Sequence, residues 1–176
     1  FSFSKSLKFL IYFSDDTDKI NRIKAIASQL EITMALKISP CDATLGATIT
    51  GVDLKSLNDS LWQEIEDAFL EYALLFFPAQ YLTDEEQLKF AKHFGKIEVL
   101  VENMTTIPIS NKDENDQFIE EDSLMMNLLK GNEGWHTDSS YMHLSAKASM
   151  LTAHVIPTSG GETEWADMRA AYANLD

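Results

Sequence analysis

Two predicted helices flanking a short apolar strand constrain the fold of this chain more than any other feature. Ser60-Leu-Trp-Gln63 and Thr83-Asp-Glu-Glu86 have the spacing of capping boxes, in which two side chains satisfy free amides at a helix start. Between these helices, Leu74-Leu-Phe-Phe-Pro78 is typical of a buried strand that a proline ends. We therefore expect a domain that mixes α and β structure.

Apolar spacing predicts the buried face of each helix. The residues expected to face the core are Leu61, Ile65, Ala68, Phe69 and Tyr72 in the first helix, and Leu88, Phe90, Ala91 and Phe94 in the second. Gly95 follows the second helix, where a C-cap needs positive φ. Upstream, β-branched residues between turn formers predict short strands over 37–40 and 47–52.

Composition excludes several classes of protein. The 176 residues are 45% hydrophobic and carry a formal charge of −14, which is the wrong sign for binding nucleic acid or an anionic membrane. The only cysteine is Cys41, so no intrachain disulfide can form, and a reducing cytoplasm is the expected location. No apolar run approaches the roughly 18 residues of a transmembrane helix.

The composition of the chain shifts at Met34, its first methionine. We expect residues 1–33 to be an N-terminal extension of doubtful status and residues 34–176 to be the domain. A short amphipathic helix is predicted over 17–31. The first residues resemble a weak signal peptide, but no small-residue cleavage site follows, so secretion is not favoured.

An EF-hand calcium loop is one interpretation of the acidic stretch over 111–122. Counted from Asp113, the loop glycine is absent and position twelve is Leu124, so the EF-hand pattern fails. A solvated loop is expected there.

The segment that predicts chemistry contains Trp135-His136-Thr137-Asp138. On an extended backbone, side chains two residues apart point to the same side, so His136 and Asp138 can converge on one ion. With one more histidine they would form the two-histidine, one-carboxylate triad that suits Fe(II). The alternative is a half-buried histidine held by a nearby aspartate.

Several motifs, in order along residues 36–176, resemble the taurine and 2,4-dichlorophenoxyacetate dioxygenase family (TauD/TfdA). They are Gly46-Ala-Thr-Ile-Thr-Gly-Val-Asp-Leu54, Leu74-Leu-Phe-Phe-Pro78, Phe94-Gly95, Trp135-His-Thr-Asp138 and Gly160-Gly-Glu-Thr-Glu-Trp165. The resemblance implies an α+β fold, namely a double-stranded β-helix (a cupin-like jelly roll) with flanking helices, incomplete at its C-terminus. It also implies a dioxygenase that uses Fe(II), 2-oxoglutarate and O2.

The resemblance implies site residues as well. His136 and Asp138 would be the first two iron ligands, and Thr163, on the strand after the double glycine, would bind 2-oxoglutarate. Asn132 and Ser139 would line the substrate pocket. An ordinary strand residue at Thr163 and a loop-capping amide at Asn132 are the alternatives. Nearby aromatic residues are expected to pack around the site: Trp135, Tyr141 and Trp165.

The substrate implied is a small organic acid. The taurine branch has a histidine and a tyrosine where this chain has Leu100 and Asn103, so an aryloxyalkanoate is favoured over taurine. Hydroxylation beside the ether oxygen would be coupled to decarboxylation of 2-oxoglutarate to succinate and CO2. Neither nucleic acid nor a membrane is expected as a partner, and a homo-oligomer is left open.

Two parts of the family site have no good candidate in the chain. The histidines His93, His143 and His154 do not fit the third iron ligand, and Arg169 does not match the arginine that binds 2-oxoglutarate. We therefore expect an N-terminal fragment that is inactive alone, with both residues beyond Asp176. The alternatives are a non-catalytic jelly-roll binding module and a different metal enzyme on this scaffold.

Overall fold

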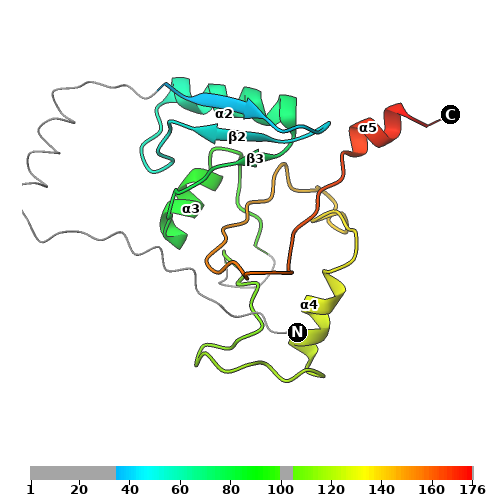
Figure 1. Cartoon of the computed structure of the whole chain (residues 1–176). Coiled ribbons are helices and arrows are strands. Elements are labelled where there is room, and N and C mark those ends of the chain that lie inside the picture. The colour runs from blue at the N-terminus through cyan, green and yellow to red at the C-terminus, as the bar shows by residue number, and fades with distance from the viewer. Residues whose placement is uncertain (1–34, 100–104, 176) are drawn as a thin grey trace, which may run out of the picture. The chain divides into compact units, whose positions relative to one another are not determined.

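The computed structural model describes residues 35–99 and 105–175. In chain order, their elements are β1 (Lys37–Pro40), β2 (Ala47–Thr50), α2 (Asp59–Tyr72), β3 (Leu75–Phe76), α3 (Asp84–Ala91), α4 (Leu124–Gly131) and α5 (Met168–Ala173) (Figure 1). The expected mixture of α and β structure is confirmed. The helix predicted over 17–31 and the positions Leu100 and Asn103 lie outside the described residues.

The chain divides into two compact units, which are described separately. The described residues of one unit are 35–81 and 162–175, and they contain the three strands, α2 and α5. Those of the other unit are 82–99 and 105–161, with α3 and α4. None of the helices in these segments is long and apolar enough to cross a membrane.

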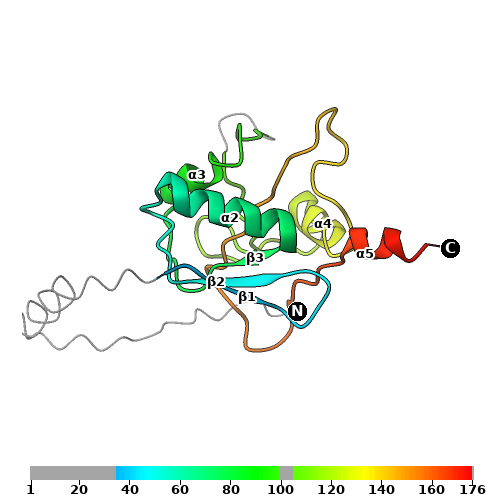
Figure 2. The same ribbon diagram turned by 90° about the horizontal axis from the view of Figure 1, so that it is seen from above.

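The first unit is built on a sheet with the order β1-β2-β3. β1 and β2 are antiparallel, with Lys37 opposite Thr50, whereas β2 and β3 are parallel, with Ala47 opposite Leu75. Helix α2 lies along the sheet in both ribbon views (Figures 1 and 2). Its Ala68 joins Ala47 and Ile49 of β2 in the core cluster. The apolar spacing of α2 therefore predicted the correct face, because Ile65 and Ala68 are both buried.

The strand predictions have different outcomes. The strand over 37–40 is confirmed, and the one over 47–52 forms but ends at Thr50, before Gly51 with φ 73°. The buried strand over 74–78 is wrong in length and burial, because β3 has two residues and Phe76 is 44% exposed. Among the described strands β3 pairs with β2 alone, so it lies at a sheet edge.

The first capping box was placed two residues too late. The N-cap of α2 is Asn58, whose side chain accepts a hydrogen bond from the amide of Leu61 at 2.9 Å. Asparagine and serine are about equally strong N-cap residues, so residue preference does not decide between Asn58 and Ser60. Ser60 lies in the first turn, and Gln63 donates instead to Asp67, at 2.9 Å.

The second capping box is confirmed at the start of α3. The Thr83 hydroxyl accepts from the Glu86 amide at 3.3 Å, and the Thr83 amide donates to the Glu86 carboxylate at 2.8 Å. Phe90 is the buried residue of this helix. The helix ends at Ala91 with Lys92 as its C-cap, so the C-cap predicted at Gly95 is wrong, because the amides of His93, Phe94 and Gly95 bond to carbonyls three residues back and not four. The positive φ expected of Gly95 is confirmed, at 143°.

The second unit contains a helix that sequence patterns did not predict. Helix α4 begins after Ser123, whose side chain accepts from the amide of Met126 at 3.2 Å. Within the described part of this unit, the pairing of extended segments is limited to an isolated bridge between Lys112 and Phe118. The small mixed sheet with helices agrees with the expected α+β class, whereas the double-stranded β-helix stays a prediction.

Candidate metal centre

The imidazole of His136 and the carboxylate of Asp138 lie side by side in the loop that follows α4. Nε2 of His136 is 3.2 Å from Oδ1 of Asp138, and the two side chains are 48% and 58% exposed. Two donors bound to one ion at a right angle, with bonds of about 2.1 Å, would lie about 3 Å apart. The pair therefore has the spacing of neighbouring ligands on a single metal ion.

The other ring nitrogen of His136 already has a hydrogen-bond partner. Nδ1 lies 2.8 Å from the carbonyl oxygen of Gly134, which can accept a hydrogen bond from it. In the neutral tautomer with the proton on Nδ1, the lone pair is on Nε2, the atom that faces Asp138. A backbone carbonyl that fixes the tautomer in this way is typical of metal-binding histidines. The nitrogen and oxygen donors thus fit a divalent first-row metal such as Fe(II).

The extended backbone expected at His136 and Asp138 does not form. His136 is in irregular structure, not in a strand, and Asp138 is the first residue of a run of turn structure, in which the amide of Met142 donates to the carbonyl of Ser139 at 3.0 Å. The bond to Gly134 orients the His136 ring. In the described part of the chain, no group of three or more His, Cys, Asp or Glu side chains could hold a metal.

Ser139 makes a contact that sequence reasoning missed. Ser139 is 6% exposed, and its hydroxyl donates to Oε2 of Glu98 at 2.5 Å. The other oxygen of Glu98, Oε1, is buried and has no hydrogen-bond partner. The two residues are 41 positions apart and share no motif, so no local sequence signal could have paired them.

The other two predicted site residues lie in different units. Asn132 is the C-cap of α4, and its side chain is exposed. Its backbone N–H donates to the carbonyls of Leu128 and Leu129. Thr163 is exposed in the unit that contains the sheet, and the strand predicted for it does not form. The structure thus brings together His136, Asp138 and Ser139, while the roles of Asn132 and Thr163 stay predictions.

Arg169 has a structural role at the end of α2. Its Nη1 donates to the carbonyls of Leu70 and Glu71 at 3.2 and 3.1 Å. Asp167, the N-cap of α5, accepts from the amides of Arg169 and Ala170. Burial raises the pKa of the Asp167 carboxyl, but these two bonds and the charge of Arg169 outweigh it and hold that pKa below its ordinary value.

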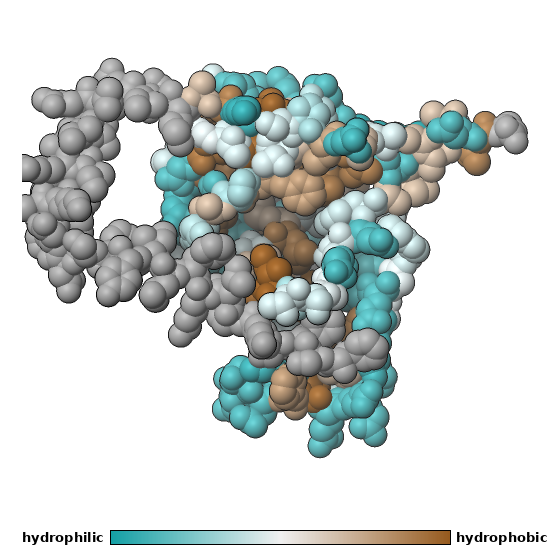
Figure 3. Space-filling view, in the orientation of Figure 1, coloured by the Kyte–Doolittle hydropathy of each residue, from teal (hydrophilic) through white to brown (hydrophobic). Residues whose placement is uncertain are grey.

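The aromatic residues near the predicted site are exposed, so the packing expected of them is not seen here. Trp135 is 71% exposed, Tyr141 73% and Trp165 50%. The space-filling view likewise shows hydrophobic residues at the surface among hydrophilic ones (Figure 3).

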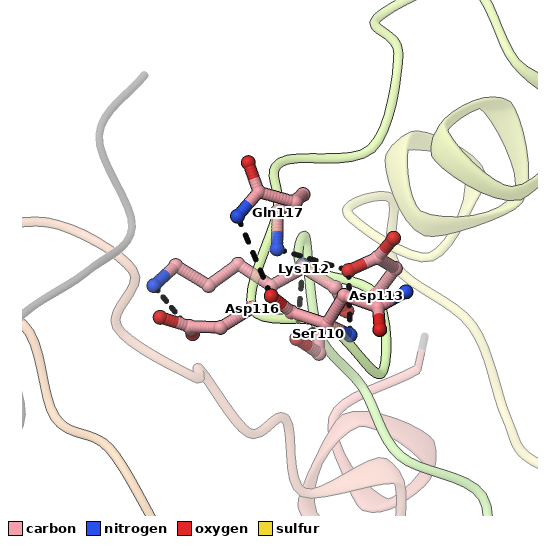
Figure 4. A network of polar contacts seen from close by, with 6 residues as sticks. Ser110, Lys112, Asp113, Asp116 and Gln117 are labelled. Carbon is pink, nitrogen blue, oxygen red and sulfur yellow. Dashed lines mark hydrogen bonds and ion pairs between the residues drawn. The ribbon is translucent and has the colours of Figure 1, made fainter.

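The acidic loop uses its carboxylates internally, as Figure 4 shows. Asp113 accepts from the amides of Asn115 and Gln117, both at 2.9 Å, and Lys112 pairs with Asp116 at 2.6 Å. The amide of Gln117 first, and then that of Asn115, lower the pKa of Asp113 against an opposing effect of burial. These bonds confirm an exposed loop that is stabilised by its own turns.

Three comparisons with known proteins bear on this geometry. The family model described as "Taurine catabolism dioxygenase TauD, TfdA family" matches residues 37–176. The chain is 47% identical over 142 residues, 81% of its length, to the "(S)-phenoxypropionate/alpha-ketoglutarate-dioxygenase" of Sphingobium herbicidovorans. It is 33% identical, also over 81% of its length, to the "Alpha-ketoglutarate-dependent 2,4-dichlorophenoxyacetate dioxygenase" of Cupriavidus pinatubonensis.

A solved structure agrees with these matches. The crystal structure of AAD-2 in complex with Mn(II) and N-oxalylglycine matches with a TM-score of 0.74 and 37% identity, over 81% of this chain and 50% of that one. The sequence and structure matches thus agree in relating this chain to proteins named as alpha-ketoglutarate-dependent dioxygenases. This chain belongs to the TauD/TfdA family. It spans 48% of the Sphingobium relative and 53% of the Cupriavidus relative, about half of each.

Proposed function

We propose that this chain supplies two iron ligands of an Fe(II)- and 2-oxoglutarate-dependent dioxygenase that hydroxylates a C–H bond of an aryloxyalkanoate. The observation that carries the proposal is the 3.2 Å approach of His136 Nε2 to Asp138 Oδ1 in a member of this family. Two relatives named for (S)-phenoxypropionate, 47% and 43% identical to this chain, support the substrate class.

His136 and Asp138 would hold Fe(II) through one nitrogen and one oxygen, and the Gly134 carbonyl would keep Nε2 unprotonated for this bond. Bound Fe(II) would supply the activation of O2 that couples decarboxylation of 2-oxoglutarate to insertion of one oxygen atom into the substrate. Both side chains are about half exposed, so a co-substrate can reach them.

The remaining residues are assigned by family resemblance. Thr163 would donate its hydroxyl to 2-oxoglutarate, and Asn132 and Ser139 would border the substrate. Arg169 is not assigned to 2-oxoglutarate, since its guanidinium bonds the end of α2. The third iron ligand is not assigned to a residue of this chain.

The test is turnover by the protein expressed from its complete reading frame. Hydroxylation of phenoxypropionate at the carbon beside the ether oxygen gives a product that breaks down to phenol and pyruvate, with one succinate and one CO2 from 2-oxoglutarate. We expect Fe(II)-dependent phenol release with one enantiomer of phenoxypropionate and little succinate with taurine. Coupled turnover of taurine, or none with any aryloxyalkanoate, would contradict the proposal.

A further inference from the structure

The bond between Ser139 and Glu98 ties the turn that follows the candidate ligands to a distant part of the same unit. Glu98 lies beyond α3, after Gly95, and Ser139 is the residue next to Asp138. A donor–acceptor distance of 2.5 Å is typical of a hydroxyl bonded to a charged carboxylate, which is a strong type of hydrogen bond.

The backbone at Ser139 shows that this bond restrains an unfavourable conformation. Ser139 has φ 56°, a left-handed value that residues with a side chain rarely adopt and that surrounding contacts must hold in place. Two contacts act here, namely the bond to Glu98 and the turn bond from Met142 to the Ser139 carbonyl. Because Asp138 and Ser139 share a peptide plane, a restraint on Ser139 also limits the direction of the Asp138 side chain.

We propose that Glu98 is a positioning residue that, through Ser139, holds the Asp138 carboxylate toward His136 for metal binding. This inference rests on the proposed function, because it takes His136 and Asp138 as metal ligands. Glu98 itself does not contact either ligand in the structure. Groups that hydrogen-bond to a metal ligand directly typically change metal affinity by about 10-fold to 100-fold when they are lost, so the effect of Glu98, which acts through Ser139, is expected at the lower end of this range.

A positioning role must be separated from a contribution to stability. Oε1 of Glu98 is buried without a partner, so the carboxylate is only partly satisfied where it lies. Glu98→Met removes this carboxylate but leaves the buried Ser139 hydroxyl without its acceptor, which lowers stability. A positioning role therefore predicts that Glu98→Met lowers metal affinity at a temperature where the variant is fully folded.

The test measures the binding of Mn(II) alone, through the electron paramagnetic resonance signal of the free ion, on the protein from the complete reading frame. We expect Glu98→Met to raise the dissociation constant about 10-fold or more, and Glu98→Gln, which keeps an acceptor, to stay within about 3-fold of wild type. Glu114→Met is the matched control, because Glu114 is an exposed glutamate of the same unit and its loss changes the net charge equally.

A double variant, Glu98→Met with Ser139→Gly, removes both partners and leaves a glycine that accepts positive φ. If the two residues act through one bond, its dissociation constant should match that of Glu98→Met. Wild-type affinity in both variants would overturn the proposal, and so would a loss of affinity that disappears when binding is measured at a temperature where each variant is fully folded. Failure of the proposed function would look different, because His136→Ala would then keep wild-type Mn(II) affinity.

Discussion

Nη1 of Arg169 donates to the carbonyl of Leu70 at 3.2 Å, although 99 residues separate the two in sequence. The same nitrogen donates to the carbonyl of Glu71, so one guanidinium serves two carbonyls in the last turn of α2. Such carbonyls have no partner within their helix, and a cation there also opposes the negative end of the helix dipole.

Replacing Arg169 should therefore lower stability and leave co-substrate binding unchanged. We expect Arg169→Ala to cost about 1–2 kcal/mol of unfolding free energy, for two bonds at a half-exposed side chain. Arg169→Lys should cost less than Arg169→Ala, because an ammonium keeps the positive charge at the end of the helix. Urea unfolding measures both. A large rise in the KM for 2-oxoglutarate without a stability change would instead assign Arg169 to the co-substrate.

The lowered pKa of Asp167 predicts that the stability of the protein falls at acidic pH. The pKa of Asp167 in the folded protein lies below the ordinary value, so its contribution is present above the unfolded pKa and is lost as pH falls through the folded one. We expect Asp167→Asn to lower the melting temperature at pH 7 and to narrow its gap from wild type below about pH 4. Asp122→Asn is the matched control at an exposed aspartate. An equal gap at all pH values would contradict this linkage.

The corrected start of α2 can be tested with two alanine variants. Asn58→Ala removes the side chain that accepts from the Leu61 amide, and it should cost about 1 kcal/mol. Ser60→Ala lies in the first helical turn and should be within about 0.5 kcal/mol of wild type. Chemical denaturation distinguishes them. The reverse order would restore the capping box first predicted from the sequence.

Ala73 ends α2 with φ 61° and ψ −19°, a conformation in which an alanine side chain is strained. We expect Ala73→Gly to raise the unfolding free energy by about 1 kcal/mol. The matched control is Ala171→Gly in α5, where the exposed helical position should make the same substitution unfavourable by about 0.5–1 kcal/mol. Destabilisation by both glycines would contradict the conformation at Ala73.

Short-range signals predicted much of the local structure. The Thr83 and Glu86 box and the apolar face with Ile65 depend on residues within one or two turns, and both are confirmed. The positive φ of Gly95 is confirmed too, although the helix already ends at Ala91. The start of α2 was missed because two N-cap candidates of similar strength stand two residues apart, and the one that starts the helix, Asn58, does not fit the box pattern.

Features that depend on distant partners were not predictable in this way. The short β3 has the composition of a buried strand, yet it pairs along one edge only, and neither pairing nor burial can be read from five residues. The contact of Ser139 with Glu98 joins segments 41 residues apart. The proximity of His136 and Asp138 was predicted from their spacing on an extended backbone, whereas the backbone here is irregular at His136 and in a turn at Asp138.

Binding of Mn(II) to histidine variants is the most direct test of the account, because it measures the metal site without requiring turnover. The protein from the complete reading frame should lose about 100-fold or more in affinity with His136→Ala or Asp138→Ala. His154→Ala, an exposed histidine of the same unit, should bind as wild type does. Unchanged Mn(II) affinity in His136→Ala would contradict the account.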